Sequence, residues 1–552
     1  MTEMVDHVLA RQQELAAERQ TWEHVWAEIA DYVLPRRSVL GSGPRSTAGE
    51  PQGRVKGGKV FDATAIHANE LLAAGLNGLL TNPAERWFTL KLAGRPEETS
   101  EAGREWLEEV ERRMLAVFAS PDSRFSPAIH ELYLDLGAFG TAAMFVGERP
   151  GEGGAPGGIL FRTFHLGEIY PSEGAFGQVD TVYRRYAWSA RQMIARWGED
   201  GVSEAVRRAG TMRPETQFEI VHGVFPRHER DPGRRDGANK PWASVHVEAA
   251  SRHLLEDEGF EEFPYLVPRW AKVPGERFGR SPAWTMLPDI KMLNAMSKTV
   301  LKAAQKIVDP PLLLADDGVI QPVTTVPGGL NYGGVDPSGR QLIQPLITGA
   351  RVDIGLDMME QRRGAIRDAF FTTLMQTPQS PQRTATQVLQ ETEERMRMMS
   401  PVLGRLQSEL LGPLVRRVFA LLLRSGTLPA MPGELDGRGL RVEYVSPIVR
   451  AQRAGELLGI GRTFETVAPF AQLDPTVWDI FDVEALARRA ADVNGVPATI
   501  LRDGEEVAAL RAQRQQQMEA AAAAAQGALA QDHGQAQATA QASTVGGGDG
   551  MA

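Results

Sequence analysis

The chain lacks several features that would narrow its chemistry at once. None of its 552 residues is cysteine, which excludes disulfides, thiolate metal sites and cysteine nucleophiles. Its longest apolar runs, such as residues 71–80, are well short of the roughly 18 residues that a membrane span needs, and the N-terminus does not resemble a signal peptide. We therefore expect a soluble protein with no membrane partner.

Motifs for catalysis and metal binding are also missing. Residues 53–59, GRVKGGK, fit the first seven positions of a phosphate-binding P-loop, but Val60 replaces the Ser or Thr that would hold magnesium, and no apolar strand precedes the loop. No GxSxG elbow is present. Several histidines lie in one β-rich region without HxH, HxxxH or HExxH spacing, which favours packing or surface roles over metal ligation. They include His222, His228, His246 and His253. The sequence thus predicts no catalytic residue, cofactor or metal site.

Net charge and chain length limit which classes of protein the chain can belong to and how many domains it has. The formal net charge of −10 argues against a protein that grips nucleic acid over its whole surface, but it permits local contact with phosphates. A chain of 552 residues is too long for one compact core, so several domains are expected.

The periodicity of apolar residues indicates an α+β fold that is mainly helical. Early helices are expected over residues 3–34, 101–118 and 127–138. Residues 159–270 alternate short strands and turns. Later, a strand is expected in LRVEYVS at 440–446 and helices from 481 to 531, before a low-complexity tail at 532–552 that we expect to be disordered.

One helix organises the middle of the chain. Ser281 and Pro282 provide a side-chain N-cap and a first-turn proline. Asp309-Pro310-Pro311 ends the helix, because each proline lacks a donor and disfavours the α conformation in its predecessor. Pro288 should kink this helix or mark a restart.

The helix has two faces at about 100° per residue. The packing face carries Ile290, Leu293, Met296, Val300, Ala303 and Ile307. The opposite face carries Lys291, Lys298, Lys302 and Lys306. No acidic residue lies between Lys291 and Asp309, so these lysines have no partner within the helix. Two interpretations remain, a solvated lysine face or a face directed at a polyanion.

A compact β-rich insert separates this helix from a second one at residues 353–371. Acidic residues begin the second helix and basic residues end it, which suits the helix dipole. The acids are Asp353, Asp357 and Glu360, and the bases are Arg362, Arg363 and Arg367. Residues 372–383 can only be a loop. Thr384 and Gln387 then form a capping box for a long helix that runs toward Leu423, and Pro401 and Pro413 should bend that helix.

The succession of helix, small β insert, helix, loop and long kinked helix resembles the portal proteins of tailed bacteriophages, specifically the head-to-tail connector of short-tailed, podovirus-type phages. The order and spacing of several segments carry the resemblance over most of residues 1–424. These segments are residues 61–90, 135–144, 164–185, 222–227, 278–298 with DPPLLLADD behind them, and 384–397. The C-terminal third matches mainly in being helical.

The resemblance implies a ring of subunits, normally a dodecamer, with wing, stem, clip and crown regions around a DNA channel. The implied regions are a wing at 1–275, a first stem helix at 276–307, a clip at 308–352, a second stem helix at 353–371, a tunnel loop at 372–383, a long wing helix and return strand at 384–480, and a crown at 481–531. Stacked rings of stem residues would line the channel and contact double-stranded DNA without reading its sequence. The implied channel residues are Lys291, Lys298, Lys302, Lys306, Arg363 and Arg367, with Gln376, Gln379, Gln382 and Arg383 in the tunnel loop.

The resemblance also implies partners and a location. The clip would bind the terminase packaging motor during filling and the tail adaptor afterwards, and the wing would contact the major capsid and scaffolding proteins. The protein would be a non-enzymatic virion component at the portal vertex, assembled in the host cytoplasm.

Four alternatives stay open, one of which is a soluble, monomeric binding module. The lysines could bond the acidic stem face of a neighbouring subunit. The chain could be a capsid or tail adaptor protein without a DNA channel. A phosphate-using enzyme has only the defective loop at 53–59 in its favour.

Overall fold

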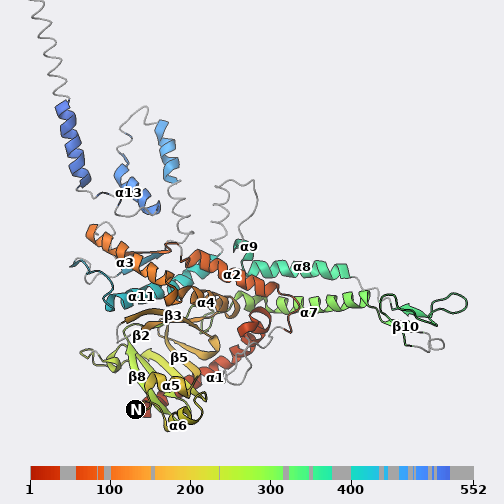
Figure 1. The fold of residues 1–552 in the computed structure, drawn as a ribbon. Coiled ribbons are helices and arrows are strands. Elements are labelled where there is room, and N and C mark those ends of the chain that lie inside the picture. The colour runs from red at the N-terminus through yellow and green to blue at the C-terminus, as the bar shows by residue number, and fades with distance from the viewer. Residues whose placement is uncertain are drawn as a thin grey trace, which may run out of the picture. The chain divides into compact units, whose positions relative to one another are not determined.

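The computed structural model of the chain describes most of its first 433 residues and parts of the remainder. The described residues are 2–37, 58–83, 85–92, 101–150, 156–234, 236–314, 322–346, 352–375, 399–433, 440–444, 459–469, 477, 480–494, 500, 502 and 506–521. They form two compact units. The first unit is Met1–Leu90, Val110–Pro429 and Val442–Gln452, and the second is Lys91–Glu109, Ala430–Arg441 and Arg453–Ala552. Helices and strands are mixed, as the sequence predicts (Figure 1).

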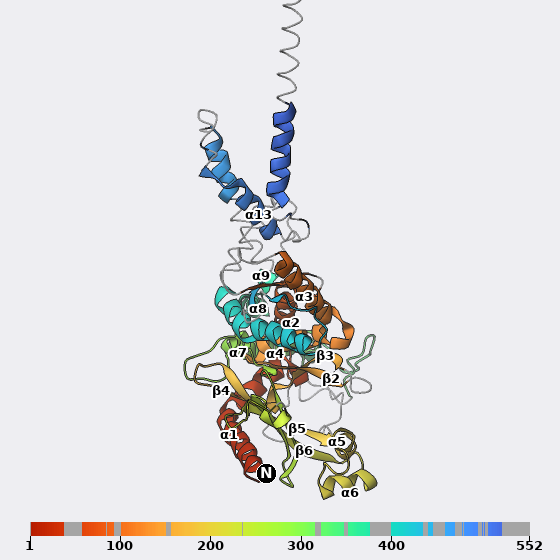
Figure 2. The ribbon, with the colours of Figure 1, turned by 90° about the vertical axis from the view of Figure 1, so that its left-hand side faces the viewer.

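A five-stranded antiparallel sheet forms the early part of the first unit, in the order β4-β5-β6-β7-β8. Its strands are β4 (Ile169–Glu173), β5 (Val179–Ser189), β6 (Gln217–Pro226), β7 (Trp242–Glu248) and β8 (His253–Phe260). Helix α1 (Thr2–Val33) covers one face, where its Val8 and Leu15 share a buried cluster with Val221 and Val245. Figure 2 shows α1 on one side of β5 and β6, with α5 and α6 on the other.

Two helices in this region were not expected from the sequence, which reads there as strands and turns only. They are α5 (Ala190–Trp197) and α6 (Glu204–Met212). The hydroxyls of Ser189 and Ser203 accept hydrogen bonds from the backbone N–H groups of Gln192 and Val206, so each helix begins at a serine N-cap. The two serines could have indicated these helices from the sequence, but the strand pattern on either side of them obscured that indication.

A second, three-stranded sheet in the order β3-β2-β9 lies beside helix α4, which in turn packs against helix α2. Its strands are β2 (Ala143–Pro150), β3 (Pro156–Phe164) and β9 (Tyr265–Leu266), and the helices are α2 (Thr64–Leu80) and α4 (Phe125–Phe139). Gly140 ends α4 with φ of +77°, and a Cβ there would lie 2.4 Å from the Gly279 carbonyl oxygen. Only glycine allows this close approach, which brings the segment before α7 against the end of α4.

Helix α7 (Pro282–Val308) agrees with the expected start and end. The Ser281 hydroxyl accepts the Trp284 N–H at 2.9 Å, and the Asp309 N–H donates to the Gln305 carbonyl at 2.8 Å. The helix is continuous through Pro288, which excludes the predicted restart. Its packing face is buried only near its beginning: Ile290 and Leu293 are buried, whereas Ile307 is 55% exposed.

Beyond α7, β10 (Leu312–Leu314) and β11 (Ile343–Pro345) pair antiparallel, consistent with the expected β-rich insert. Helix α8 (Val352–Ala369) then runs beside α7 (Figure 1). The expectation that residues 372–383 form only a loop is wrong at its start, because α9 (Thr372–Met375) is one helical turn. Phe371, at φ of +56°, ends α8, and its carbonyl then accepts the Met375 N–H at 3.2 Å.

The helix expected to bend at Pro413 contains a π-helical turn just before that residue. Residues 399–406 are helical, η7 (Gln407–Leu411) is π-helical, and α11 (Gly412–Arg424) follows. The Gly412 N–H bonds the Gln407 carbonyl, five residues back, and Pro413 has no N–H to restore the α register. The proline therefore perturbs the helix by widening one turn. The capping box at Thr384 lies outside the described residues.

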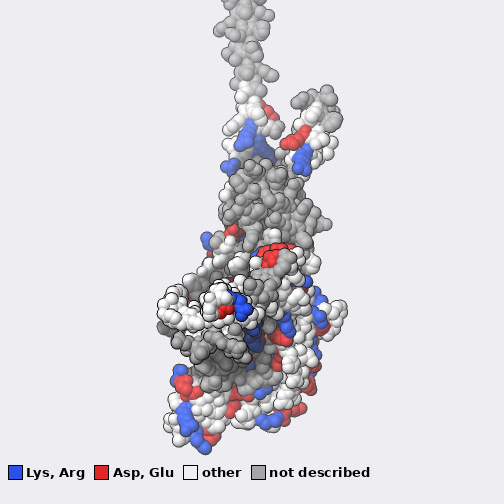
Figure 3. Space-filling view, turned by 90° about the vertical axis from the view of Figure 1, so that its right-hand side faces the viewer, with Lys and Arg blue, Asp and Glu red and all other residues white. Residues whose placement is uncertain are grey.

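The remaining elements are α3 (Glu101–Ala119), β1 (Phe88–Leu92), β12 (Leu440–Tyr444) and α13 (Val483–Asn494). Described residues 459–469 and 506–521 are also helical. Figure 3 shows the face toward which the β10–β11 insert points, and charged residues of both signs are interspersed there. That face carries no single large basic patch among the residues drawn in colour, which agrees with the acidic net charge.

Candidate nucleic-acid interface

The four predicted lysines of α7 have different surroundings. The Nζ atom of Lys291 lies 3.1 Å from Glu28 Oε2 of α1, so this charge is paired. Lys298 Nζ lies 5.2 Å from the centroid of the Phe61 ring. Lys302 and Lys306 are exposed, and neither has an acidic partner within 4.0 Å among the residues described. Lys298, Lys302 and Lys306 are here called the basic strip.

The predicted arginines of α8 are already paired within the chain. Arg363 donates to Asp62 Oδ2 through Nε at 3.0 Å and through Nη2 at 2.8 Å. Arg367 Nη1 lies 2.9 Å from Glu360 Oε1, and hydrogen bonds from both arginines lower the pKa of Glu360 below its ordinary value. Their positive charges are therefore largely balanced, and the unbalanced charge of the helix pair is concentrated in the basic strip.

The helix pair has a basic face and an acidic face. Val300 of α7 faces α8, since a Cβ on Gly355 would lie 3.0 Å from Val300 Cγ2. At about 100° per residue, the basic strip lies on the opposite side of α7 from Val300. The acidic residues of α8 likewise lie on the side of that helix turned away from Gly355. They are Asp353, Asp357 and Glu360.

Exposed apolar side chains occupy the flanks between these two faces. Met292 and Leu301 of α7 are 47% and 50% exposed, and about 100° per residue places them on opposite flanks of the basic strip. Leu356 and Met358 of α8 are 50% and 49% exposed. Apolar surface on both flanks is typical of a helix pair that contacts other macromolecules on two sides.

The predicted tunnel-loop residues all lie outside the described residues. They are Gln376, Gln379, Gln382 and Arg383. The structure therefore places α7 beside α8, with the basic strip on the side of α7 turned away from α8.

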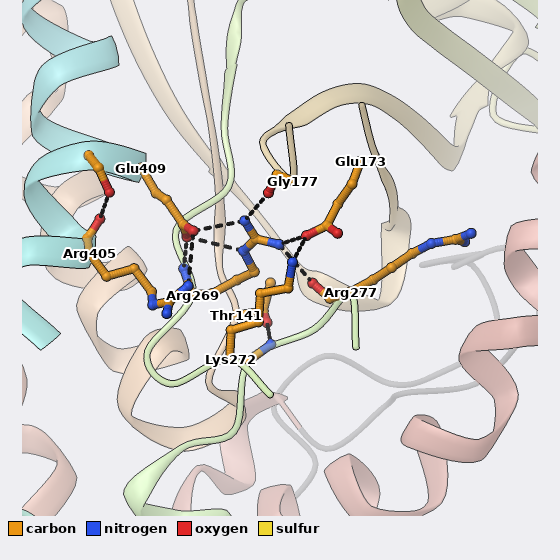
Figure 4. A network of polar contacts seen from close by, with 10 residues as sticks. Thr141, Glu173, Gly177, Arg269, Lys272, Arg277, Arg405 and Glu409 are labelled. Atoms are coloured by element: carbon orange, nitrogen blue, oxygen red, sulfur yellow. Dashed lines mark hydrogen bonds and ion pairs between the residues drawn. The ribbon is translucent and has the colours of Figure 1, made fainter. Parts of the chain in front are cut away.

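A buried ionic cluster that the sequence did not indicate joins the two ends of the segment containing α7, α8 and α9 (Figure 4). Arg269 is 1% exposed and precedes α7, whereas Glu409 lies in the π-helical turn that follows α9. Arg269 donates to Glu409 through Nη2 at 2.7 Å, Nε at 3.1 Å and its backbone N at 2.9 Å. We call this cluster, with Glu173 and Lys272, the Arg269 joint.

The joint is well satisfied electrostatically. Arg269 also donates to Glu173, to the Gly177 carbonyl at 3.1 Å and to the Arg277 carbonyl at 3.3 Å. Burial alone would lower the pKa of Arg269, but the hydrogen bonds and charges of Glu409 and Glu173 raise it above its ordinary value. The sequence could have suggested that Arg269 is buried, because its neighbours Val267, Pro268 and Trp270 are apolar. Its partner Glu409, 140 residues away, could not be deduced from the sequence.

His222 and His246 have packing roles and His228 is exposed, in line with the packing or surface roles that the sequence favours. His222 and His246 stack with ring centroids 3.9 Å apart, and His222 lies 3.0 Å from Ser244 Oγ and 3.2 Å from the Tyr265 hydroxyl. Burial lowers the pKa of His222 well below its ordinary value and that of His246 to about 3. Lys59, the last residue of the P-loop-like motif, contacts Asp31 at 2.7 Å. Over the described ranges no group of three acidic or histidine side chains is placed to hold a metal ion.

The helix pair thus presents one basic face, one acidic face and exposed apolar flanks, an arrangement typical of a surface that contacts other macromolecules. The chain belongs to the bacteriophage head-to-tail connecting protein family, whose signature it matches over residues 5–501. It is 33% identical over 519 residues to the probable portal protein of Bordetella phage BPP-1, covering 92% of this chain and 90% of that protein. It is 32% identical over 525 residues to the portal protein of Salmonella phage epsilon15, covering 92% and 91%.

The expected function is thereby confirmed: the chain is a phage portal protein, a non-enzymatic connector between head and tail. Proteins of this family are virion components at the portal vertex, where they connect with capsid and tail. In the part of the chain that the structure describes, no helix is long and apolar enough to cross a membrane.

Proposed function

We propose that the chain assembles into a ring, normally a dodecamer, around a channel for double-stranded DNA, with α7 as the inner and α8 as the outer stem helix. The observation that carries this proposal is the polarity of the helix pair. The basic strip is unbalanced, faces away from α8 and is bordered on both sides by exposed apolar residues. In a ring, the apolar flanks would meet the neighbouring subunits and the basic strip would face the channel.

The chemistry of the basic strip suits a conduit. Ammonium groups contact phosphates without reading bases, so every part of a genome can pass. Rotational symmetry multiplies each lysine into a ring of charge, while the acidic remainder of the surface limits adhesion of DNA elsewhere.

The remaining regions follow the same scheme. Residues 308–352 act as the clip that docks the terminase packaging motor and later the tail adaptor, and 372–383 as the tunnel loop. The wing comprises 1–275 and 384–480 and contacts the major capsid and scaffolding proteins. Residues 481–531 form the crown. Assembly takes place in the host cytoplasm before the ring enters the virion.

Negative-stain imaging of the purified full chain, viewed end-on with rotational averaging, tests this proposal. We expect a ring with a central hole wide enough for duplex DNA. Monomers, or closed particles without a hole, would overturn the channel role and favour an adaptor without a channel.

The placement of α7 inside α8 needs a separate test. Single cysteines at Lys302 and at Asp357 can be introduced cleanly because the chain has no other cysteine. If α7 lines the channel, a bulky thiol reagent linked to a polymer too wide for the channel should modify residue 357 and spare residue 302 in the assembled ring. The reverse pattern would place α8 inside.

A further inference from the structure

Residues 59–62, the segment just before α2, make a set of contacts that neither the family nor the sequence assigns. We call this segment the strap. It crosses α7 and reaches α8 at the point where the helix pair leaves the rest of the first unit. Its polar and cationic contacts involve helices α2, α7 and α8, and its Lys59 also pairs with Asp31 of α1.

The side-chain amide of Asn294 binds the strap backbone at two points. Its Nδ2 donates to the Lys59 carbonyl at 2.8 Å, and its Oδ1 accepts the Phe61 N–H at 2.6 Å. Asn294 is only 8% exposed, so its amide is held against the strap and away from solvent. The strap is thereby fixed in register along α7.

Asp62 connects the strap to both helices of the pair. Its carboxylate is 6% exposed and accepts the N–H of Thr64, the first residue of α2, at 2.9 Å. Its Oδ2 atom accepts both Arg363 bonds from α8 and lies 3.4 Å from Ser297 Oγ of α7. Burial alone would raise the pKa of Asp62, but the hydrogen bonds from Thr64 and Arg363 lower it, so the side chain is a carboxylate at neutral pH.

The strap also contacts the basic strip itself. The Phe61 ring is 40% exposed and lies under the ammonium group of Lys298. A cation is attracted to the face of an aromatic ring, so Phe61 restrains the first lysine of the strip. Farther along, α7 and α8 have few buried contacts, because the apolar residues there are exposed on the flanks.

We infer that the strap sets the register and orientation of α7 against α8, and that Asp62 is the positioning residue that keeps the basic strip directed away from α8. The inference rests on the proposed function in one respect: the direction of the basic strip matters for DNA passage only if α7 lines a channel. Its structural content concerns one chain and can be tested without a ring or DNA.

The test uses an engineered disulfide between α7 and α8 in the full chain. Val300→Cys with Gly355→Cys places two thiols where a Cβ added to Gly355 would lie 3.0 Å from Val300 Cγ2, and the absence of other cysteines removes competing pairs. The rate of disulfide formation under mild oxidation then reports how often the two helices occupy the native register.

Asp62→Asn in this background should slow disulfide formation on the order of three- to tenfold, since a buried carboxylate that accepts two arginine bonds is lost. Glu360→Gln is the matched control, because Glu360 contacts the same Arg363 from α8 itself and should leave the rate unchanged. An equal rate in Asp62→Asn and the control would overturn the inference. Reversing the pair, Asp62→Arg with Arg363→Asp, should recover part of the lost rate.

A second variant covers the case in which Asp62→Asn does not fold. Arg363→Gln removes the same contact from the more exposed partner, which is 28% exposed. Unchanged disulfide formation in folded Arg363→Gln would equally overturn the inference. A chain that forms the disulfide normally but never forms a ring would contradict the proposed function and leave the role of the strap intact.

Discussion

The Arg269 joint and the basic strip use positive charge in opposite ways. The Arg269 guanidinium is 1% exposed and is bonded to two carboxylates and two carbonyl oxygens. The lysines of the strip are exposed, and the structure describes no acidic partner for Lys302 or Lys306. A buried charge must be satisfied locally and therefore determines structure, whereas an exposed and unbalanced charge is available to a partner.

The two regions also differ in how their contacts are arranged. The joint ties together segments 140 residues apart, Arg269 before α7 and Glu409 after α9, and so closes the base of the excursion between them. In the helix pair beyond it, α7 and α8 are joined by the Asp62 carboxylate, by the ion pair of Arg362 with Asp289 at 2.6 Å, and by a close approach at Gly355. We therefore expect mutations in the joint to reduce stability, and mutations in the basic strip to affect binding instead.

The largest effect is expected for Arg269→Met. Removing the cation leaves Glu409 and Glu173 partly buried without their main partner, which should lower the free energy of unfolding of the first unit by about 3–5 kcal/mol. Chemical denaturation of the purified chain measures this. Arg405→Gln is the control, since Arg405 contacts the same Glu409 at 3.4 Å from a more exposed position and should cost less than about 1 kcal/mol. Equal losses would mean that burial does not distinguish the two contacts.

A second effect should come from the stacked histidines. Their pKa values in the folded chain lie below the ordinary value of 6.5, so the unfolded chain binds more protons once the pH falls below about 6.5. Stability contributed by the neutral pair is present above that pH and is lost as the pH falls toward 3, by at most about 1.4 kcal/mol per pH unit for each histidine. The nearby charges are Arg184, Arg196 and Glu256.

Unfolding measured at pH 7, 6 and 5 checks this dependence. The window from 6.5 to about 5 lies above the ordinary range of carboxyl titration, so the histidines dominate it. Replacing the pair with His222→Asn and His246→Gln should flatten the dependence in that window. If both chains lose stability equally between pH 7 and 5, the stacked pair is not the acid-sensitive element.

A smaller effect is expected from two glycines of α8 that differ only in their neighbours. A Cβ on Gly364 would meet nothing within 4 Å, so Gly364→Ala should stabilise the chain by roughly 0.5–1 kcal/mol through helix propensity. A Cβ on Gly355 would lie 3.0 Å from Val300, so Gly355→Ala should lose most or all of that gain. Thermal unfolding of the two variants compares them, and equal gains would mean that α7 and α8 do not approach closely in solution.

The difference between the regions also explains how much the sequence could predict. The start of α7 at Ser281 and its end at Asp309 depend on local chemistry, the N-cap and the prolines, and both were predicted. The lysine face was likewise predictable from helical spacing. The pairing of Arg269 with Glu409, and of Arg363 with Asp62, depends on contacts between segments 140 and 301 residues apart, which no local pattern encodes. The bend at Pro413 was a prediction from local chemistry, whereas the π-helical turn over Gln407–Leu411 that precedes this proline was not predicted.

The smallest effect on stability is expected where the effect on function should be greatest. Changing Lys298, Lys302 and Lys306 together to Gln removes exposed charges that stabilise nothing within the described chain, apart from the Phe61 contact of Lys298. Thermal unfolding should therefore be nearly unchanged. Duplex DNA binding by the assembled ring should weaken, and its dependence on salt concentration should become shallower, because fewer counterions are released from the phosphates.

A matched triple variant distinguishes this from a general effect of lost charge. Arg191, Arg207 and Arg208 are exposed bases near α5 and α6 whose charges are paired with Glu215 and Glu204, so changing all three to Gln alters the net charge equally. This control should leave the salt dependence of DNA binding as it is in the unmodified ring. If the two triple variants weaken DNA binding equally, the basic strip has no special role in DNA binding. Its lysines would then be assigned to contacts with the acidic face of a neighbouring subunit. In that case their loss would reduce the stability of the ring.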